Sequence, residues 1–270
     1  MADCGLVNLG ACLPQKFFEF VLNILNAPIK PFLNLTLKLF TEPINTSLFS
    51  TFWIIIVYVL SMFYALLLVG TGFSLMLSGD NATKRENSKQ WLRNIVIMIV
   101  LIQASFFIYN LAIDLSSTMT TATLTLLDSD FFMISIDDIN DLGLAIIFGI
   151  VYLLTLLISM IILVIRYAFV AVGVVLFPLA IFFYFFQPLK QYGSLLINFL
   201  GINIFVPVLG IILLIGFSTL SNLSVFSDMK IIILIAAFNL VNISMLFLMS
   251  FSIVKAGMSA YSQIKNLGVK

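Results

Sequence analysis

Long blocks without charged side chains divide this chain. Residues 43–79 contain no Asp, Glu, Lys or Arg, and comparable blocks recur at 94–113, 142–165, 167–189, 191–227 and 231–254. An α-helix needs about 20 such residues, at about 1.5 Å per residue, to cross roughly 30 Å of hydrocarbon. The pattern therefore predicts a chain that crosses a lipid bilayer several times.

Composition agrees with this pattern. Hydrophobic residues make up 62% of the 270 residues and charged residues 9%, against roughly 45–50% and 25% in soluble domains. Backbone groups in lipid must be hydrogen-bonded internally, and the blocks are longer than the roughly ten alternating residues of a barrel strand. We therefore predict an all-α, polytopic helical membrane protein with five or six transmembrane helices.

The first 49 residues form a separate predicted segment. On one helical face between residues 15 and 40 lie the apolar side chains of Phe17, Phe18, Val21, Ile24 and Leu25, and the segment contains Pro28 and Pro31. This favours an external amphipathic pair of interfacial helices over a span. Cys4 and Cys12 precede it; they would pair on an oxidising face or stay as two thiols. Residues 50–270 form the predicted transmembrane domain.

Charge distribution orients the spans. The loop 78–94 holds Lys84, Arg85, Lys89 and Arg93 and is predicted to be cytoplasmic, with the N-terminus outside. The loop 114–142 holds aspartates and no Lys or Arg, and is predicted to be external. Its acidic residues are Asp114, Asp128, Asp130, Asp137, Asp138 and Asp141.

The number of crossings depends on residues 142–189. The blocks 142–165 and 167–186 are each long enough to cross, and only Arg166 separates them. Two crossings would place the lysines after residue 254 outside, against the charge bias. One net crossing, with Pro178 bending or breaking the second half, would place them inside. We favour the odd count, with the C-terminus inside.

Catalytic chemistry is weakly represented. The chain has no histidine, which removes the commonest general base and zinc ligand. It has no P-loop, HExxH or GxSxG motif, and no Asp or Glu lies inside a predicted crossing, where an energy-coupled transporter usually needs one. We predict no enzymatic activity, no catalytic residues, no metal site and no cofactor.

Polar residues within the apolar blocks are the remaining candidates. A lone cation such as Arg166 is costly in lipid; we interpret it as a hairpin or interface anchor, with contact to an aqueous path or to a partner's acid as the alternative. Five amides are expected to form interhelical or intersubunit hydrogen bonds, or alternatively to line a lumen. They are Gln103, Asn198, Asn203, Asn239 and Asn242. Glycines at 70, 72, 149, 173, 201 and 210 are expected to allow close helix approach.

The basic loop also has two interpretations. Its cations flank Trp91, an indole suited to headgroup depth, so orientation in the membrane alone explains the charges. The alternative is that Lys84, Arg85, Lys89, Trp91 and Arg93 contact a cytoplasmic partner or a phosphate backbone.

Several segments resemble one family. The basic motif KRENSKQWLRN leads into IVIMIVLIQASFFIYNL, and RYAFVAVGVVLFPLAIFFYFF is followed by QPLKQYGSLLINFL. Over roughly residues 50–200 the chain is similar to TrbL-type channel subunits. These are polytopic inner-membrane components of type IV secretion and conjugation machines, with relatives in archaeal DNA-exchange systems.

The resemblance implies a non-enzymatic subunit of the prokaryotic cytoplasmic membrane. It implies a ring of five or six copies that contacts secretion-type ATPases below and pilus or channel subunits outside. Single-stranded DNA, protein or pilin would be the cargo. A solute transporter or permease subunit, and a membrane scaffold for a surface filament, are the alternatives. The first predicts a monomer or dimer with a pocket at mid-membrane, and the second predicts no continuous pore.

Overall fold

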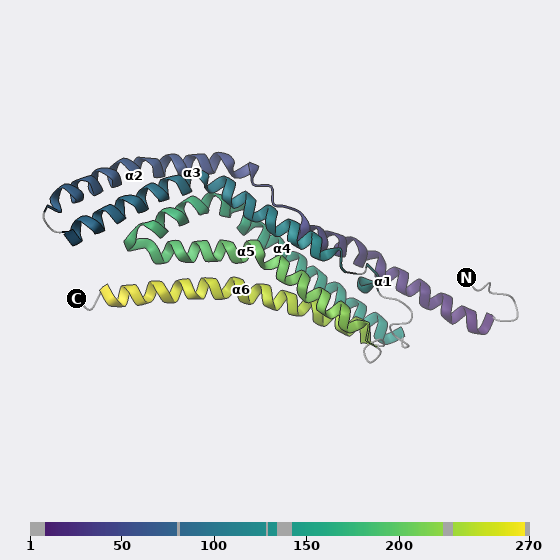
Figure 1. Cartoon of the computed structure of the whole chain (residues 1–270). Helices are drawn as coiled ribbons and strands as arrows, with labels where there is room; N and C mark the ends of the chain where they lie inside the picture. Colours follow the sequence, from purple (N-terminus) through teal and green to yellow (C-terminus); the bar gives the residue numbers. More distant parts are fainter. Residues whose placement is uncertain (1–8, 80–81, 128, 134–141, 224–228, 268–270) are drawn as a thin grey trace. The chain divides into compact units, whose positions relative to one another are not determined.

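The computed structural model describes residues 9–79, 82–127, 129–133, 142–223 and 229–267. These residues contain no strand, which confirms the all-α prediction. Their helices are α1 (Leu9–Thr41), α2 (Ser50–Leu77), α3 (Ala82–Leu124), α4 (Leu142–Phe185), α5 (Lys190–Ser221) and α6 (Lys230–Leu267), with short 3₁₀ turns η1 (Ser47–Phe49), η2 (Ser129–Phe132) and η4 (Gln187–Leu189) (Figure 1).

Five segments among the described residues are long and apolar enough to cross a membrane. They are Ser47–Leu77, Ala82–Leu124, Ile146–Phe185, Gln187–Ser221 and Lys230–Phe251. The chain is therefore a multi-pass helical membrane protein, with five rather than six candidate spans.

Residues 142–185 explain the odd number. Helix α4 continues through both Arg166 and Pro178, so no reversing turn allows residues 142–165 and 167–186 to cross separately. Of the two predicted effects of Pro178, a bend or a break, the break is wrong. Proline removes one backbone hydrogen bond, but Val174 and Ile181 on either side of it are buried, and this packing holds the helix together.

Both predicted loops beside the second span are shorter than expected. Helix α3 begins at Ala82, so most of the basic segment 78–94 is helical, and it ends at Leu124, so the first part of 114–142 is helical too. Lys, Arg and Glu are good helix formers. At the other end Thr123 Oγ1 donates 2.6 Å to the Met119 carbonyl, which satisfies the hydroxyl within the helix. Residues 134–141, with three of the aspartates, lie outside the described residues.

Helix α1 replaces the expected pair of interfacial helices. It is one helix of 33 residues that includes Pro28 and Pro31, so the predicted break is wrong. The residues that follow the prolines bury one face, at Ile29, Leu33 and Phe40, and this burial outweighs the lost backbone hydrogen bonds. Cys4 lies outside the described residues, and so does the side chain of Cys12.

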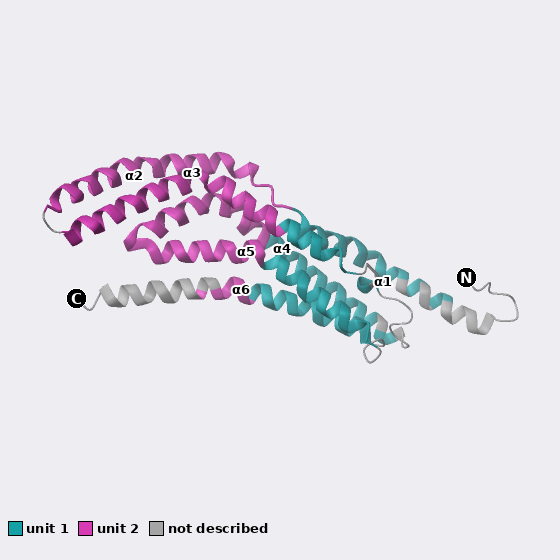
Figure 2. Ribbon diagram, in the orientation of Figure 1, with its two compact units in different colours: residues 1–42, 117–165, 206–246 teal, residues 43–116, 166–205, 247–270 magenta. Residues whose placement is uncertain are grey.

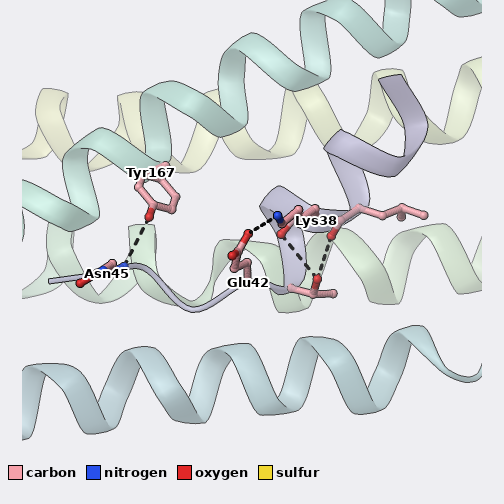
Figure 3. Close-up of polar contacts among 6 residues, drawn as sticks. Lys38, Glu42, Asn45 and Tyr167 are labelled. Carbon is pink, nitrogen blue, oxygen red and sulfur yellow. Dashed lines mark hydrogen bonds and ion pairs between the residues drawn. The ribbon is translucent and has the colours of Figure 1, made fainter. Parts of the chain in front are cut away.

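The chain divides into two compact units, to which α3, α4, α5 and α6 each contribute (Figure 2). Unit 1 comprises residues 1–42, 117–165 and 206–246. Aromatic packing contributes to its core: the ring centroid of Phe238 lies 6.1 Å from that of Phe132 and 6.0 Å from that of Tyr152. An exposed ion pair of 3.5 Å joins Lys38 of α1 to Glu42, the residue that follows the helix (Figure 3); such a pair contributes little to stability.

Unit 2 comprises residues 43–116, 166–205 and 247–270. One core cluster joins Tyr109 of α3, Val170 and Val174 of α4, and Leu200 of α5. A second cluster joins α2 to α3 and α4 through the buried residues Val57, Leu60, Tyr64, Ile95, Met98, Ile102 and Ile181. The apolar stripes recur three or four residues apart, as expected for helices packed along one face.

The non-helical connection between α1 and α2 is held by polar contacts in unit 2. The backbone N–H of Asn45 donates 3.3 Å to the Tyr167 hydroxyl of α4 (Figure 3). The Thr46 hydroxyl donates 2.5 Å to the side-chain oxygen of Asn110 on α3. These contacts satisfy polar groups of a non-helical segment that has few partners of its own.

The glycines divide into two groups. A Cβ atom at Gly173 would overlap the Tyr109 hydroxyl and Leu200, and one at Gly210 would lie 2.9 Å from Phe40, so both glycines permit close helix approach. A Cβ atom at Gly70, Gly72 or Gly201 would meet nothing within 4 Å. Among the described residues these three therefore mark no close approach of another helix, and approach by a second copy of the chain stays a prediction.

Substitution of Gly173 by alanine is expected to destabilise unit 2. The added methyl group must displace Tyr109, whose hydroxyl donates 2.8 Å to the Val170 carbonyl. We expect a loss of about 1–3 kcal/mol in the free energy of unfolding, the usual cost of overpacking a core, measured by thermal or denaturant unfolding in detergent micelles. Gly201→Ala is the matched control and should be neutral or stabilising, because alanine is the better helix former. Equal effects of the two substitutions would contradict the packing described for Gly173.

Candidate functional site

Arg166 is buried within unit 2, with only 5% of its surface exposed. From α4 its Nε donates 2.7 Å to the Asn203 carbonyl, and its Nη2 donates 3.2 Å to the Ile204 carbonyl, both on α5. A planar guanidinium presents several donors in fixed directions and therefore suits two neighbouring acceptors. Arg166 thus joins two helices, and a hairpin at this position is wrong because α4 continues through it.

Pro207 explains why the Asn203 carbonyl accepts from a side chain. In an α-helix the carbonyl of residue 203 would accept from the N–H of residue 207, but α5 has proline there, and proline has no N–H. The Asn203 carbonyl is therefore left without its helical donor, and in a bilayer no water replaces it. Arg166 supplies that donor from the neighbouring helix.

Further side chains complete this polar cluster, which we call the Arg166 cluster. The Ser116 hydroxyl of α3 donates 2.6 Å to the Ile204 carbonyl. The Asn203 amide donates 2.8 Å to the Phe199 carbonyl, while its Oδ1 is buried and has no hydrogen-bond partner among the described residues. The cluster satisfies backbone groups of α5, and it brings together two of the candidates from the sequence, Arg166 and Asn203.

The other amides do not join this cluster. Gln103 on α3, Asn198 on α5 and Asn239 on α6 are exposed within apolar stretches of their helices. Asn242 in unit 1 is buried, and neither of its amide atoms has a partner among the described residues. An exposed amide on a spanning helix is costly in lipid unless a polar group covers it.

The basic segment presents two faces of α3. Arg85, Lys89 and Arg93 recur every four residues and are exposed, so they form one stripe, which we call the basic stripe. Lys84 and Trp91 are seven residues apart, so they share a different face. Both of these line hollows beside α2: Lys84 one of about 450 Å³ and Trp91 one of about 550 Å³. The periodicity of the sequence would have separated these two faces had the segment been recognised as helical.

Metal binding finds no support in the described residues. They contain no group of three or more Cys, Asp or Glu side chains that could hold an ion. Two polar arrangements stand out among them, the buried hydrogen bonds around α5 and the exposed cations at the start of α3. The first arrangement supports structure, and the second suits an anionic surface or partner.

A double-mutant cycle tests the link between Arg166 and Pro207. Arg166→Leu removes both donors and leaves the Asn203 carbonyl unsatisfied, so we expect it to lower the free energy of unfolding by about 1–3 kcal/mol. In a Pro207→Ala background the backbone N–H of residue 207 satisfies that carbonyl. The same Arg166 substitution should then cost about 1 kcal/mol less, the net value of one such hydrogen bond.

Pro178→Ala is the control background for this cycle. It removes a helical proline from α4 without changing the carbonyls that Arg166 contacts. Unfolding in detergent micelles should therefore show the full Arg166→Leu penalty with Pro178→Ala and a reduced penalty with Pro207→Ala. The same penalty in all backgrounds would mean that Arg166 does not compensate for Pro207.

Comparisons of the chain with protein-family models, with curated proteins and with solved structures found no match. The resemblance to TrbL-type channel subunits is carried by the sequence segments alone, and family membership stays a prediction. Both segments that carry it most strongly, residues 84–94 and 166–190, lie in or beside helices of unit 2. They contribute the basic stripe and Arg166.

Proposed function

We propose that this protein is a non-enzymatic channel or platform subunit of a type IV secretion or conjugation-like machine. It assembles as a ring of five or six copies in the cytoplasmic membrane of a prokaryote, with its N-terminus outside and its C-terminus inside. The machine moves DNA across that membrane, or else protein or pilin. The resemblance of residues 84–94 and 166–190 supports the family, and two features of the structure support the role.

The exposed amides carry the proposal. Asn198 and Asn239 lie on the surface of helices that are long and apolar enough to span the membrane. Lipid chains offer no hydrogen bonds, so polar side chains in spanning helices normally face a protein partner or water. Sister copies of the chain supply such partners in a ring, and a ring also surrounds a polar path for cargo.

The basic stripe supports a cytoplasmic role. Arg85, Lys89 and Arg93 are exposed on one face at the start of α3. Three cations on one face attract phosphate groups of single-stranded DNA or the acidic surface of a secretion ATPase. In either case the stripe lies where cargo reaches the membrane from the cytoplasm.

Oligomeric mass tests the ring. We expect the purified chain in mild detergent to have the mass of five or six copies, measured by light scattering with the detergent contribution subtracted. Asn198→Leu combined with Asn239→Leu should shift the population toward smaller species. Each interhelical hydrogen bond is worth about 0.6–2 kcal/mol, and a ring repeats the loss at every interface.

Asn242→Leu is the matched control for this experiment. It makes the same substitution on α6 at a buried position, so the oligomeric mass should not change. A monomer or dimer that binds a small solute saturably would overturn the ring and favour a transporter. Equal dissociation by Asn239→Leu and Asn242→Leu would show that the exposed amide has no special part in assembly.

Salt-dependent DNA binding tests the basic stripe. We expect the chain in nanodiscs to bind single-stranded DNA, and Arg85→Gln, Lys89→Gln and Arg93→Gln together to weaken it. If each cation neutralises one phosphate, the slope of log K against log salt should fall in magnitude by about 2, from about 0.7 per contact. The measurement is fluorescence anisotropy across a salt series.

A second triple variant controls for net charge. Lys16, Lys30 and Lys38 are exposed on α1, and their replacement by glutamine removes the same charge from the predicted external segment. DNA affinity should then stay at the wild-type value. Labelling of a Glu86→Cys variant from the cytoplasmic side checks that orientation is preserved. Equal losses of DNA affinity in both triple variants would mean that net charge alone causes the effect and would contradict a specific role of the basic stripe.

A further inference from the structure

Helix α2 carries a shallow apolar depression within unit 2. Small residues at 65 and 70 lie between larger side chains and leave a hollow of about 560 Å³, lined by Met62, Ala65, Leu66, Val69, Gly70 and Phe73. Of the five candidate spans, α2 is also the least covered by the rest of the chain. A Cβ atom at Gly70 would meet nothing within 4 Å. This hollow is therefore open to whatever surrounds the protein in the membrane.

Toward the end of α2 the hollow becomes polar. Gly70 and Phe73 also line the hollow of about 450 Å³ that contains Lys84, Ser78 and Ser88. That hollow in turn shares Ser74 and Ser88, whose hydroxyl oxygens lie 3.0 Å apart, with the hollow of about 550 Å³. Beyond these hydroxyls the lining is Asn87, Gln90, Trp91, Asn94 and Gln187. One continuous surface thus passes from apolar side chains to a cation with hydroxyls, and then to amides and an indole.

We propose that this surface binds one phosphate-bearing membrane lipid. Its hydrocarbon chain lies along the depression from Met62 to Phe73, and its phosphate lies against Lys84 and the neighbouring hydroxyls. Ammonium and hydroxyl groups are donors that suit phosphate oxygens, and Trp91 lies where an indole suits the headgroup region. The proposal goes beyond the function proposed above and does not rest on it, because it needs only that the chain spans a membrane.

Length distinguishes a lipid from a second protein helix as the occupant. A helix rises about 16 Å from residue 62 to residue 73 at about 1.5 Å per residue, which is close to half of the roughly 30 Å hydrocarbon thickness. A lipid chain covers one leaflet, whereas a spanning helix of a second copy would need a groove through both. The cation at one end of the depression, Lys84, also matches an anionic headgroup, whereas an uncharged helix would gain nothing from it.

Native mass spectrometry of the purified full chain tests the site, with phosphatidylglycerol and phosphatidylcholine added in equal amounts. We expect one phosphatidylglycerol to be retained in preference to phosphatidylcholine. Gly70→Phe fills the depression without a clash inside the chain and should abolish retention. Gly72→Phe is the matched control: the same helix also has open space there, but Gly72 lines none of the three hollows, so retention should persist.

The headgroup end has its own pair of variants. Lys84→Gln should lower the apparent affinity for phosphatidylglycerol about fivefold, the change expected from one lysine near a lipid headgroup. Lys89→Gln removes the same charge from the same helix outside the hollows and should have no such effect. Retention that Gly70→Phe leaves intact, or equal losses with Lys84→Gln and Lys89→Gln, would overturn the proposal.

Two further outcomes identify a different occupant. Competition by inorganic phosphate alone, with no dependence on Gly70, would mean that the polar end binds free anions and that no lipid chain is seated. A change of oligomeric mass with Gly70→Phe but not Gly72→Phe would mean that a second copy covers the depression. Either result would overturn the lipid site, and neither would bear on the basic stripe, since Gly70→Phe and Gly72→Phe change none of its residues.

Discussion

Every backbone carbonyl of a helix in a bilayer needs a hydrogen-bond donor, and Pro207 deprives one carbonyl of its donor. It withholds the N–H that the Asn203 carbonyl would receive, at a depth where water does not substitute. Arg166 on α4 donates hydrogen bonds of 2.7 and 3.2 Å to two successive carbonyls, those of Asn203 and Ile204. A buried cation is itself costly in lipid. The guanidinium of Arg166 and the Asn203 carbonyl therefore satisfy each other, and this contact holds α4 and α5 together within unit 2.

Neighbouring contacts in unit 2 follow the same rule. Ser116 donates to the second carbonyl, Ile204, and Tyr109 donates to the carbonyl of Val170 one turn beyond Arg166. The absence of a Cβ at Gly173 gives the Tyr109 ring its place. Polar side chains here serve backbone acceptors, and apolar contacts such as Tyr109 with Phe177, whose ring centroids lie 5.3 Å apart, surround them. A satisfied polar cluster of this kind favours one helix register over others, because a shifted register would leave its groups unpaired.

The sequence was sufficient to predict the helices and the membrane, because uncharged blocks of spanning length have few other physical explanations. It singled out Arg166 as the one cation inside such a block. It did not connect Arg166 with Pro207, because the two residues are far apart in the chain and only packing brings α4 beside the Asn203 carbonyl. The sequence also predicts the helix ends wrongly: the polar residues after Asp114 and before Asn94 are typical of loops, although Lys, Glu and Thr are compatible with a helix once one face is packed.

The interpretation of the charged residues at the start of α3 depends on whether they lie in a loop or in a helix. In a loop, the four cations and Trp91 between residues 84 and 93 would be equivalent, and orientation in the membrane would be sufficient to explain the charges. As a helix they divide: Arg85, Lys89 and Arg93 lie on an exposed stripe, while Lys84 and Trp91 line hollows beside α2. Membrane orientation requires only that the cations be near the span and does not require them to be sorted by face. Their separation by face therefore needs a second cause. The two contacts proposed above, of the basic stripe with cargo or an ATPase and of Lys84 with a lipid phosphate, would provide one.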